Sequence, residues 1–330
     1  MQKVALGRSG LEVSRLGFGC MGLAEFYGNA LSHDDAHAVL EGALERGVNF
    51  FDTADMYGSG LNEEQLNGFL KKHRDEVVLA TKFAIRRDES GAWLGLSNDP
   101  KYIRESCEGS LKRLGVDVID LYYMHRRDRE VPVEESVGAM ADLVKEGKVR
   151  ALGLSEVSIE TLKKANEVHP IAAVQSEYSI VTRDMEAEVI PACRALGTAL
   201  VAYSPLGRGI LTGAYRTTGD FKEGDYRLAG NPRFSDGALE KNVSLVDKLA
   251  ALAEKKNASL AQIALAWVMA KGDDIIPIPG TKKLSRLDEN IGAMNVHLST
   301  DDIAEIKAAV PPEEVAGARY AEATVSTLNA

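Results

Sequence analysis

The stretch VVLATKF, residues 77–83, decides the fold, because it is a continuous apolar run broken by a single lysine. Runs of this kind are typical of parallel strands that are buried on both faces. Seven similar runs follow or precede it, and amphipathic stretches of helical period separate them. The predicted strands are residues 16–22, 49–54, 77–83, 118–125, 149–156, 172–179, 199–205 and 274–280. Eight strands alternating with helices predict an α/β fold of the (β/α)8 TIM-barrel type.

The remaining segments fit around one such barrel, and we expect a single domain spanning residues 1–330. Residues 3–6 and 11–13 flank a Gly-Arg-Ser-Gly turn and predict a β-hairpin that caps one end of the barrel. The other predicted additions are an insertion after strand seven at about 206–242, two helices at about 284–293 and 300–310, and a C-terminal tail at about 311–330. An insertion that long is usually functional.

Composition excludes several classes of protein. The chain has 39 Lys and Arg against 49 Asp and Glu, and its net charge of −10 disfavours nucleic acid and membranes as partners. Its three cysteines are widely spaced and form no C-x-x-C pair, which argues against a disulfide framework or a zinc cluster. The N-terminus has no apolar signal core, and the apolar stretch 263–270 is too short to span a bilayer. We therefore expect a cytoplasmic protein that acts on a small molecule.

Two familiar dinucleotide signatures do not fit the chain. Gly17, Gly19 and Gly22 spell G-x-G-x-x-G, which in a Rossmann fold opens a helix and precedes an acidic residue by about 20 positions. Here residues 23–31 read as a loop, and Asp52 follows Gly22 by 30 positions. No tyrosine has a lysine four positions later, as a short-chain dehydrogenase would need. The cofactor signal must therefore lie elsewhere in the chain.

A metal site is also disfavoured. His33 and His37 have the spacing of two ligands on one helix face, but the glutamate that a zinc protease needs is missing. Both histidines fall in the first turn of a predicted helix, which favours a solvated helix start. The strand ends carry no cluster of His and carboxylates, so a metal-dependent barrel hydrolase is the least favoured alternative.

The predicted strand ends carry four ionisable residues, Asp52, Tyr57, Lys82 and His125. In a parallel barrel, the catalytic groups collect where the strands finish. Lys82 lies inside an apolar run, where an unpaired ammonium would cost several kcal/mol, so we expect Asp52 on the neighbouring strand to pair with it.

These four residues suit carbonyl reduction. A Tyr hydroxyl is a poor acid at neutral pH, and a neighbouring ammonium would lower its pKa. Tyr57 could then protonate a carbonyl oxygen that His125 polarises through a hydrogen bond. The site has no activated nucleophile, so the hydride must come from a cofactor. Loops after strands seven and eight are the usual phosphate site of a barrel, and Thr281, Lys282 and Arg286 there suit a 2′-phosphate.

Over nearly its whole length the chain resembles the aldo-keto reductase family. The matching motifs, in family order, are FFDTADMYG with Asn62-Glu63, TKF, DLYYMH, GKVRALGLSE, QSEYS, AYSPLGRGILTG and IPGTKKLSRLDENIGA. The resemblance implies an NADP(H)-dependent oxidoreductase that reversibly reduces an aldehyde or ketone, with Asp52, Tyr57, Lys82 and His125 as catalytic tetrad and Tyr57 as the acid. The alternative function is that of the potassium-channel β subunits. These proteins share the fold and the tetrad but act mainly as partners that sense the state of the cofactor.

The resemblance also implies a cofactor site and a substrate site. Tyr203 would stack on the nicotinamide, Gln175 and Ser155 would bind its carboxamide, and Ser204, Leu206 and Arg208 would hold the pyrophosphate. The full cofactor set is Gly19, Cys20, Met21, Asp52, Ser155, Glu156, Gln175, Tyr203, Ser204, Leu206, Arg208, Gly280, Thr281, Lys282, Arg286, Glu289 and Asn290. The substrate set is Met21, Phe26, Tyr57, Trp93, His125 and Arg126.

Two positions depart from the family pattern. Glu156 stands where the family commonly has Asn, and a carboxylate cannot donate a hydrogen bond as an amide does. Gly280 stands where many members have Lys, so a 2′-phosphate must rely on Lys282 and Arg286.

Overall fold

The computed structural model describes the chain except for residues 89, 223–224, 326 and 329–330. Its main sheet has eight parallel strands in the order in which they occur along the chain. The strands are β3 (Phe18–Gly19), β4 (Phe50–Asp52), β5 (Val78–Phe83), β8 (Ile119–Met124), β9 (Val149–Ser155), β10 (Ile171–Glu177), β11 (Ala199–Tyr203) and β12 (Ile275–Pro277). Hydrogen bonds from Gly17 N to Pro277 O (2.9 Å) and from Gly19 N to Pro279 O (3.4 Å) join the first strand to the last. The predicted (β/α)8 barrel is confirmed.

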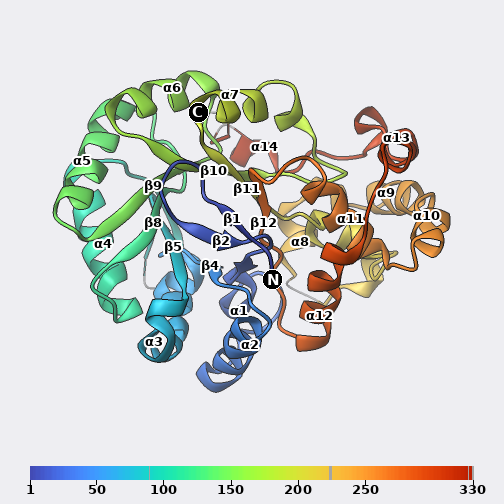
Figure 1. Cartoon of the computed structure of the whole chain (residues 1–330), viewed down its shortest axis with the longest axis horizontal. Helices are drawn as coiled ribbons and strands as arrows, with labels where there is room; N and C mark the ends of the chain where they lie inside the picture. Colours follow the sequence, from blue (N-terminus) through green and yellow to red (C-terminus); the bar gives the residue numbers. More distant parts are fainter. Residues whose placement is uncertain (89, 223–224, 326, 329–330) are drawn as a thin grey trace.

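Helices surround the strands, as Figure 1 shows. Those that pack around the barrel are α2 (His33–Glu45), α3 (Leu61–His73), α4 (Pro100–Leu114), α5 (Val133–Lys145), α6 (Ile159–Val168), α7 (Val189–Leu196), α11 (Leu260–Met269) and α12 (Leu284–Gly292). Ser32 caps α2 by accepting a hydrogen bond from Asp35 N, and Gly115 ends α4 with a left-handed φ of 67°.

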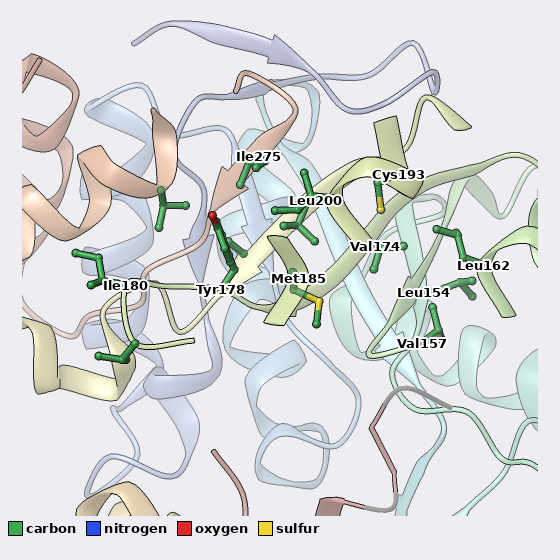
Figure 2. Packing of buried hydrophobic residues seen from close by; sticks show 14 of the residues in the cluster. Leu154, Val157, Leu162, Val174, Tyr178, Ile180, Met185, Cys193, Leu200 and Ile275 are labelled. Carbon is green, nitrogen blue, oxygen red and sulfur yellow. The ribbon is translucent and has the colours of Figure 1, made fainter. Parts of the chain in front are cut away.

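The core lies in two layers because side chains alternate along each strand. Outward-facing residues pack under the helices: Figure 2 shows Leu154, Val174 and Leu200 of the strands against Leu162 of α6 and Cys193 of α7. Inward-facing residues, such as Ala80, Leu121 and Val201, fill the barrel and meet the N-terminal hairpin. The interior is therefore a packed core, and a cavity opens toward the carboxyl ends of the strands.

The predicted N-terminal hairpin is formed by β1 (Lys3–Ala5) and β2 (Glu12–Ser14), paired antiparallel. In Figure 1 it crosses in front of the barrel strands. Val4 and Val13 pack into the interior cluster, so the hairpin closes the amino-terminal end of the barrel.

One local prediction needs correction, and two regions contain elements that were not predicted. A one-turn helix, α1 (Met21–Ala24), replaces the end of the predicted strand 16–22 and the start of the loop expected at 23–31, since four residues are too few to show a helical period. A second hairpin, β6 (Ile85–Arg87) with β7 (Trp93–Leu96), extends from β5 and was not predicted. The insertion folds partly into 3-10 turns and α8 (Tyr226–Gly230), and runs into α9 (Ala238–Asp247) and α10 (Ala250–Lys255).

Helix α13 (Thr300–Ala309) follows α12, as predicted, and the tail after it contains a short helix, α14 (Glu322–Val325). Figure 1 shows the tail returning from α13 toward the barrel strands. Among the described residues, no helix combines the length and hydropathy that crossing a bilayer requires.

Candidate active site

Strand alternation explains why chemically active side chains meet at one mouth of the barrel. In β5, Val78 and Ala80 face the interior, and Lys82 continues the same row. On the other strands, too, every second residue faces the barrel interior. The residues placed in this way at the carboxyl end are Asp52, Lys82, His125, Ser155, Gln175 and Tyr203.

Asp52 and Lys82 form a buried ion pair on neighbouring strands, as predicted. Lys82 Nζ contacts Asp52 Oδ1, donates to Thr53 O (2.8 Å), and lies 3.4 Å from the Tyr57 hydroxyl. Gln175 Nε2 donates to the other oxygen of Asp52 at 2.8 Å. Burial lowers the pKa of Lys82, but Asp52 and Tyr57 raise it more, and the net pKa lies above the usual value. The ammonium is therefore charged and fixed beneath the Tyr57 oxygen.

Tyr57 lies on a tight turn between β4 and α3. Gly58 and Gly60 adopt left-handed φ values of 58° and 97°, which glycine permits without strain. Gly58 N donates to Glu25 Oε2 (2.8 Å), and Glu25 also forms an ion pair with Arg87. Arg87 Nη1 in turn donates to Met56 O (2.9 Å). Glu25 and Arg87 thus hold the turn that presents Tyr57, a role that sequence reasoning missed.

The pKa of Tyr57 differs from our expectation. Burial raises it, Lys82 lowers it, and Asp52 raises it again, so that the net pKa lies above the ordinary value. The prediction of a lowered pKa was wrong for this state, because Asp52 offsets much of the ammonium charge and because burial penalises the phenolate. Tyr57 is consequently a protonated, neutral acid at physiological pH.

His125 follows β8 and faces Tyr57, with ring centroids 5.9 Å apart in an edge-to-face arrangement. Burial, and the charges of Arg126 and Lys82, hold the pKa of His125 well below 6.5. Its Nδ1 is buried and has no hydrogen-bond partner among the described residues. A neutral imidazole can donate one hydrogen bond from its other nitrogen toward the cavity.

A cavity of about 590 Å³ opens at this mouth. Asp52, Tyr57 and His125 line it, whereas Lys82 lies fully buried behind them. All six predicted substrate residues line it as well: Met21, Phe26, Tyr57, Trp93, His125 and Arg126. Tyr27, Tyr226 and Tyr320 are further aromatic wall residues that sequence reasoning did not identify.

Most predicted cofactor residues line the same cavity. They are Gly19, Met21, Asp52, Ser155, Gln175, Tyr203, Ser204, Leu206, Arg208, Gly280, Thr281, Lys282, Arg286, Glu289 and Asn290. Two predicted residues do not. Cys20 is buried in the core beneath α2, with its thiol 3.8 Å from Phe18 O. Glu156 points away from the cavity and accepts hydrogen bonds from Glu177 N (3.0 Å) and the Tyr203 hydroxyl (2.8 Å).

The far end of the cavity suits phosphate groups. Lys282 Nζ donates to two backbone carbonyls, those of Tyr27 (3.1 Å) and Asn29 (2.6 Å), and pairs with none of the described carboxylates. Arg208 adopts a left-handed φ of 56°, and its buried Nε has no partner among the described residues. Arg286 is half-exposed and pairs with Glu289. Cations without full compensation are what a multiply charged phosphate ligand needs, so these residues fit a phosphorylated dinucleotide.

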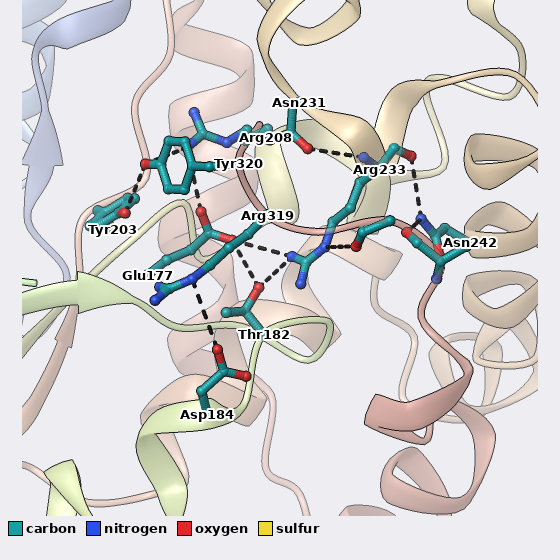
Figure 3. Close-up of polar contacts among 12 residues, drawn as sticks. Glu177, Thr182, Asp184, Tyr203, Arg208, Asn231, Arg233, Asn242, Arg319 and Tyr320 are labelled. Atoms are coloured by element: carbon teal, nitrogen blue, oxygen red, sulfur yellow. Dashed lines mark hydrogen bonds and ion pairs between the residues drawn. The ribbon is translucent and has the colours of Figure 1, made fainter. Parts of the chain in front are cut away.

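A polar network joins the insertion and the tail to the barrel (Figure 3). Glu177 pairs with Arg208 (3.4 Å) and with Arg233 of the insertion (3.2 Å). The Tyr320 hydroxyl of the tail lies 2.8 Å from the Tyr203 hydroxyl and accepts a hydrogen bond from Arg208 Nη2 (2.8 Å). The tail and the insertion therefore touch side chains that also line the cavity.

Arg319, next to Tyr320, anchors the tail. Its guanidinium lies 3.1 Å from both carboxylate oxygens of Glu156, and both side chains are buried.

Within the described part of the chain, no three His, Cys, Asp or Glu side chains gather as a metal site would require.

Comparisons with known proteins agree with this architecture. A model of the Aldo/keto reductase family matches residues 15–311. Probable aldo-keto reductase 1 of Glycine max is 47% identical over 321 residues, covering 97% of this chain and 92% of that protein. An aldo-keto reductase of Schizosaccharomyces pombe, whose name includes NADP(+), is 45% identical over 313 residues, covering 93% and 92%.

Solved structures are also similar. The glycerol dehydrogenase of Gluconobacter oxydans has a TM-score of 0.84 at 28% identity, covering 94% of this chain and 96% of that chain. The holo form of an aldo-keto reductase from Bacillus halodurans has a TM-score of 0.77 at 30% identity, covering 94% and 97%.

Proposed function

Because this chain belongs to the aldo/keto reductase family of oxidoreductases, we propose that it transfers hydride reversibly between NADP(H) and the carbonyl carbon of an aldehyde or ketone. The observation that carries the proposal is the position of the Lys82 ammonium, paired with Asp52 and 3.4 Å from the Tyr57 hydroxyl. Such a group stabilises negative charge on the phenol oxygen as the proton leaves.

Each catalytic residue has a separate role. Tyr57 donates its proton to the carbonyl oxygen as the carbonyl is reduced, and in alcohol oxidation the phenolate takes the proton back. Lys82 stabilises the developing phenolate, and Asp52 keeps the ammonium charged and in place. Neutral His125 donates a hydrogen bond to the carbonyl oxygen and so orients and polarises it.

NADPH, when bound, supplies the hydride for this reaction. Ser155 and Gln175 would bind the carboxamide of its nicotinamide, and Tyr203 would stack on the ring. Arg208, with Ser204 and Leu206, would bind the pyrophosphate. Thr281, Lys282, Arg286, Glu289 and Asn290 would hold the adenosine end, and Gly19, Met21 and Gly280 would line the site. Support comes from their shared cavity, from the Lys282 ammonium, which pairs with no described carboxylate, and from the buried Nε of Arg208, which has no partner among the described residues.

Isotope transfer under multiple turnover tests the proposal. The protein is incubated with NADPH deuterated at nicotinamide C4 and a panel running from aliphatic aldehydes to bulky ketones, with NADH in parallel. We expect deuterium in the carbinol carbon of the alcohol, many turnovers per protein molecule, and a preference for NADPH. Oxidation that stops at one equivalent of cofactor for every carbonyl would instead indicate a cofactor-sensing binding protein.

A further inference from the structure

The substrate end of the cavity contains one charged group that the proposed reaction does not use. Around Tyr57 and His125 the walls are mainly apolar or aromatic, formed by Met21, Phe26, Met56 and Ile85, among others. Arg126 lies among them and is only 7% exposed. A guanidinium in such surroundings calls for a counter-ion, because burying an unpaired charge is costly.

The protein itself supplies Arg126 with little compensation. Its Nη1 donates to His125 O (2.7 Å) and to Ser155 Oγ (3.2 Å), and both acceptors are neutral. Among the described residues it forms no ion pair with a carboxylate. Glu156, an acidic neighbour whose charge acts on Arg126, is itself paired with Arg319, whose guanidinium lies 3.1 Å from both of its oxygens. The Arg126 backbone is fixed as well, since its carbonyl accepts a hydrogen bond from the buried amide of Asn98 (3.1 Å).

Each of the other cations that line the cavity either pairs with a carboxylate or lies at the end that suits phosphates. Arg227 pairs with Asp225 (2.7 Å), and its guanidinium lies against the rings of Tyr215 and Phe221. Lys282, Arg286 and Arg208 belong to the end of the cavity that suits phosphates, and Arg286 also pairs with Glu289. Arg126 remains as a fixed, buried cation next to His125, the residue expected at the carbonyl oxygen.

We propose that Arg126 binds a carboxylate on the substrate, and that the preferred substrates are aldehydes or ketones with an apolar or aromatic body and a carboxylate near the carbonyl. This inference rests on the proposed function. The fixed guanidinium selects for a planar anion through two N–H donors, Nε and Nη2, that bond to no described residue. The apolar walls select for the rest of the substrate.

Matched substrates test the inference. We would compare the 2-, 3- and 4-carboxybenzaldehydes with their neutral methyl esters, and measure kcat/KM for each acid and ester at saturating NADPH. At least one acid should exceed its ester by about tenfold or more, since a charge-assisted hydrogen-bonded pair strengthens binding by at least about that factor. In Arg126→Met this acid-to-ester ratio should fall by at least about tenfold, and in Arg126→Lys it should fall less, because lysine keeps the charge but loses the planar fork.

Arg127→Met is the matched control. Arg127 is the next residue in the same loop, but its Nη1 bonds to Thr161 Oγ1 (2.8 Å) and the side chain does not line the cavity. The acid-to-ester ratio of Arg127→Met should equal that of the wild type. Thermal unfolding and NADPH titration of each variant separate a folding defect from a change in recognition.

The outcomes are distinct. If no acid exceeds its ester in the wild type, or if Arg126→Met leaves the acid-to-ester ratio unchanged, the inference is overturned while the proposed function stands. A loss of NADPH affinity in Arg126→Met at an unchanged ratio would also overturn it, and would assign Arg126 to the nicotinamide site beside Ser155. Absence of turnover on every acid and every ester would instead contradict the proposed function itself.

Discussion

The floor and the cover of the cavity are both built from buried charges, but they are assembled differently. The floor, defined here as Asp52, Tyr57, Lys82 and His125, comes from neighbouring strands and one turn of a single sheet. The cover, defined as Arg208 and Arg233 of the insertion with Arg319 and Tyr320 of the tail, is tied to Glu156 and Glu177 at the ends of two strands. The floor therefore inherits its geometry from the barrel, whereas the cover depends on contacts between distant segments.

This difference separates chemistry from positioning. Asp52, Tyr57 and His125 of the floor line the cavity where the reaction is proposed, and Lys82 behind them sets the charge next to Tyr57. Of the cover residues, Arg208 and Tyr320 line the cavity themselves, and Tyr320 also contacts Tyr203. Changes in the floor should reduce catalysis most, and changes in the cover should act mainly on cofactor affinity.

The largest effect is expected from breaking the Asp52–Lys82 pair. Lys82→Met leaves the Asp52 carboxylate buried without its cation, which should lower the free energy of unfolding by about 3–5 kcal/mol. It also removes the charge that stabilises the Tyr57 phenolate, so kcat should fall by about 10²–10⁴-fold. Denaturant unfolding and steady-state kinetics measure the two effects.

The double variant Asp52→Asn with Lys82→Met separates these effects. Removing both charges should restore most of the stability but none of the activity. If activity returned together with stability, Lys82 would have a structural role and no part in catalysis.

A smaller effect is expected in the cover. Arg319→Met leaves Glu156 buried without its partner and loosens the Tyr320 contacts to Tyr203 and Arg208. We expect NADPH to bind about tenfold more weakly, a change of about 1.4 kcal/mol, with kcat altered less than affinity. Fluorescence titration with NADPH measures this change.

An exposed pair in the same region provides the control. Arg216 and Asp247 are paired but solvent-exposed, so Arg216→Met should leave NADPH affinity and stability nearly unchanged. Equal weakening by Arg216→Met and Arg319→Met would mean that the buried tail anchor has no special role.

The smallest effect concerns pH. His125 has a pKa well below 6.5 and Tyr57 has one above 10, so neither group should titrate between these values. The log of kcat/KM for carbonyl reduction should stay flat across this range and decline only at higher pH, when Tyr57 loses its proton. A break near pH 6.5 that disappears in His125→Asn would contradict a neutral His125.

The predictability of the two regions follows from how far apart their partners lie in the sequence. The floor was predictable because a lone lysine in an apolar run needs a carboxylate, and adjacent strands place Asp52 and Lys82 on the same inward face. The cover was not predictable, since Glu156 and Arg319 are 163 residues apart and the sequence around neither residue indicates the other as its partner. The same applies to Glu25 and Arg87, which are 62 residues apart.

Burial also limited how well the pKa values and contacts of side chains could be predicted from residue types. Lys82 does lower the pKa of Tyr57, as predicted, but burial reverses the net direction, and burial depends on the whole fold. For Glu156, the residue type indicated an altered contact with the cofactor, and the structure turns its carboxylate toward Arg319 instead.

Tyr57→Phe isolates proton donation by Tyr57, because it removes one hydroxyl and keeps the ring that faces His125. We expect the variant to bind NADPH as the wild type does, judged by quenching of protein fluorescence, and its turnover with a good carbonyl substrate to fall by about 10²–10⁴-fold. Turnover near that of the wild type, with NADPH still bound, would contradict the assignment of Tyr57 as the acid.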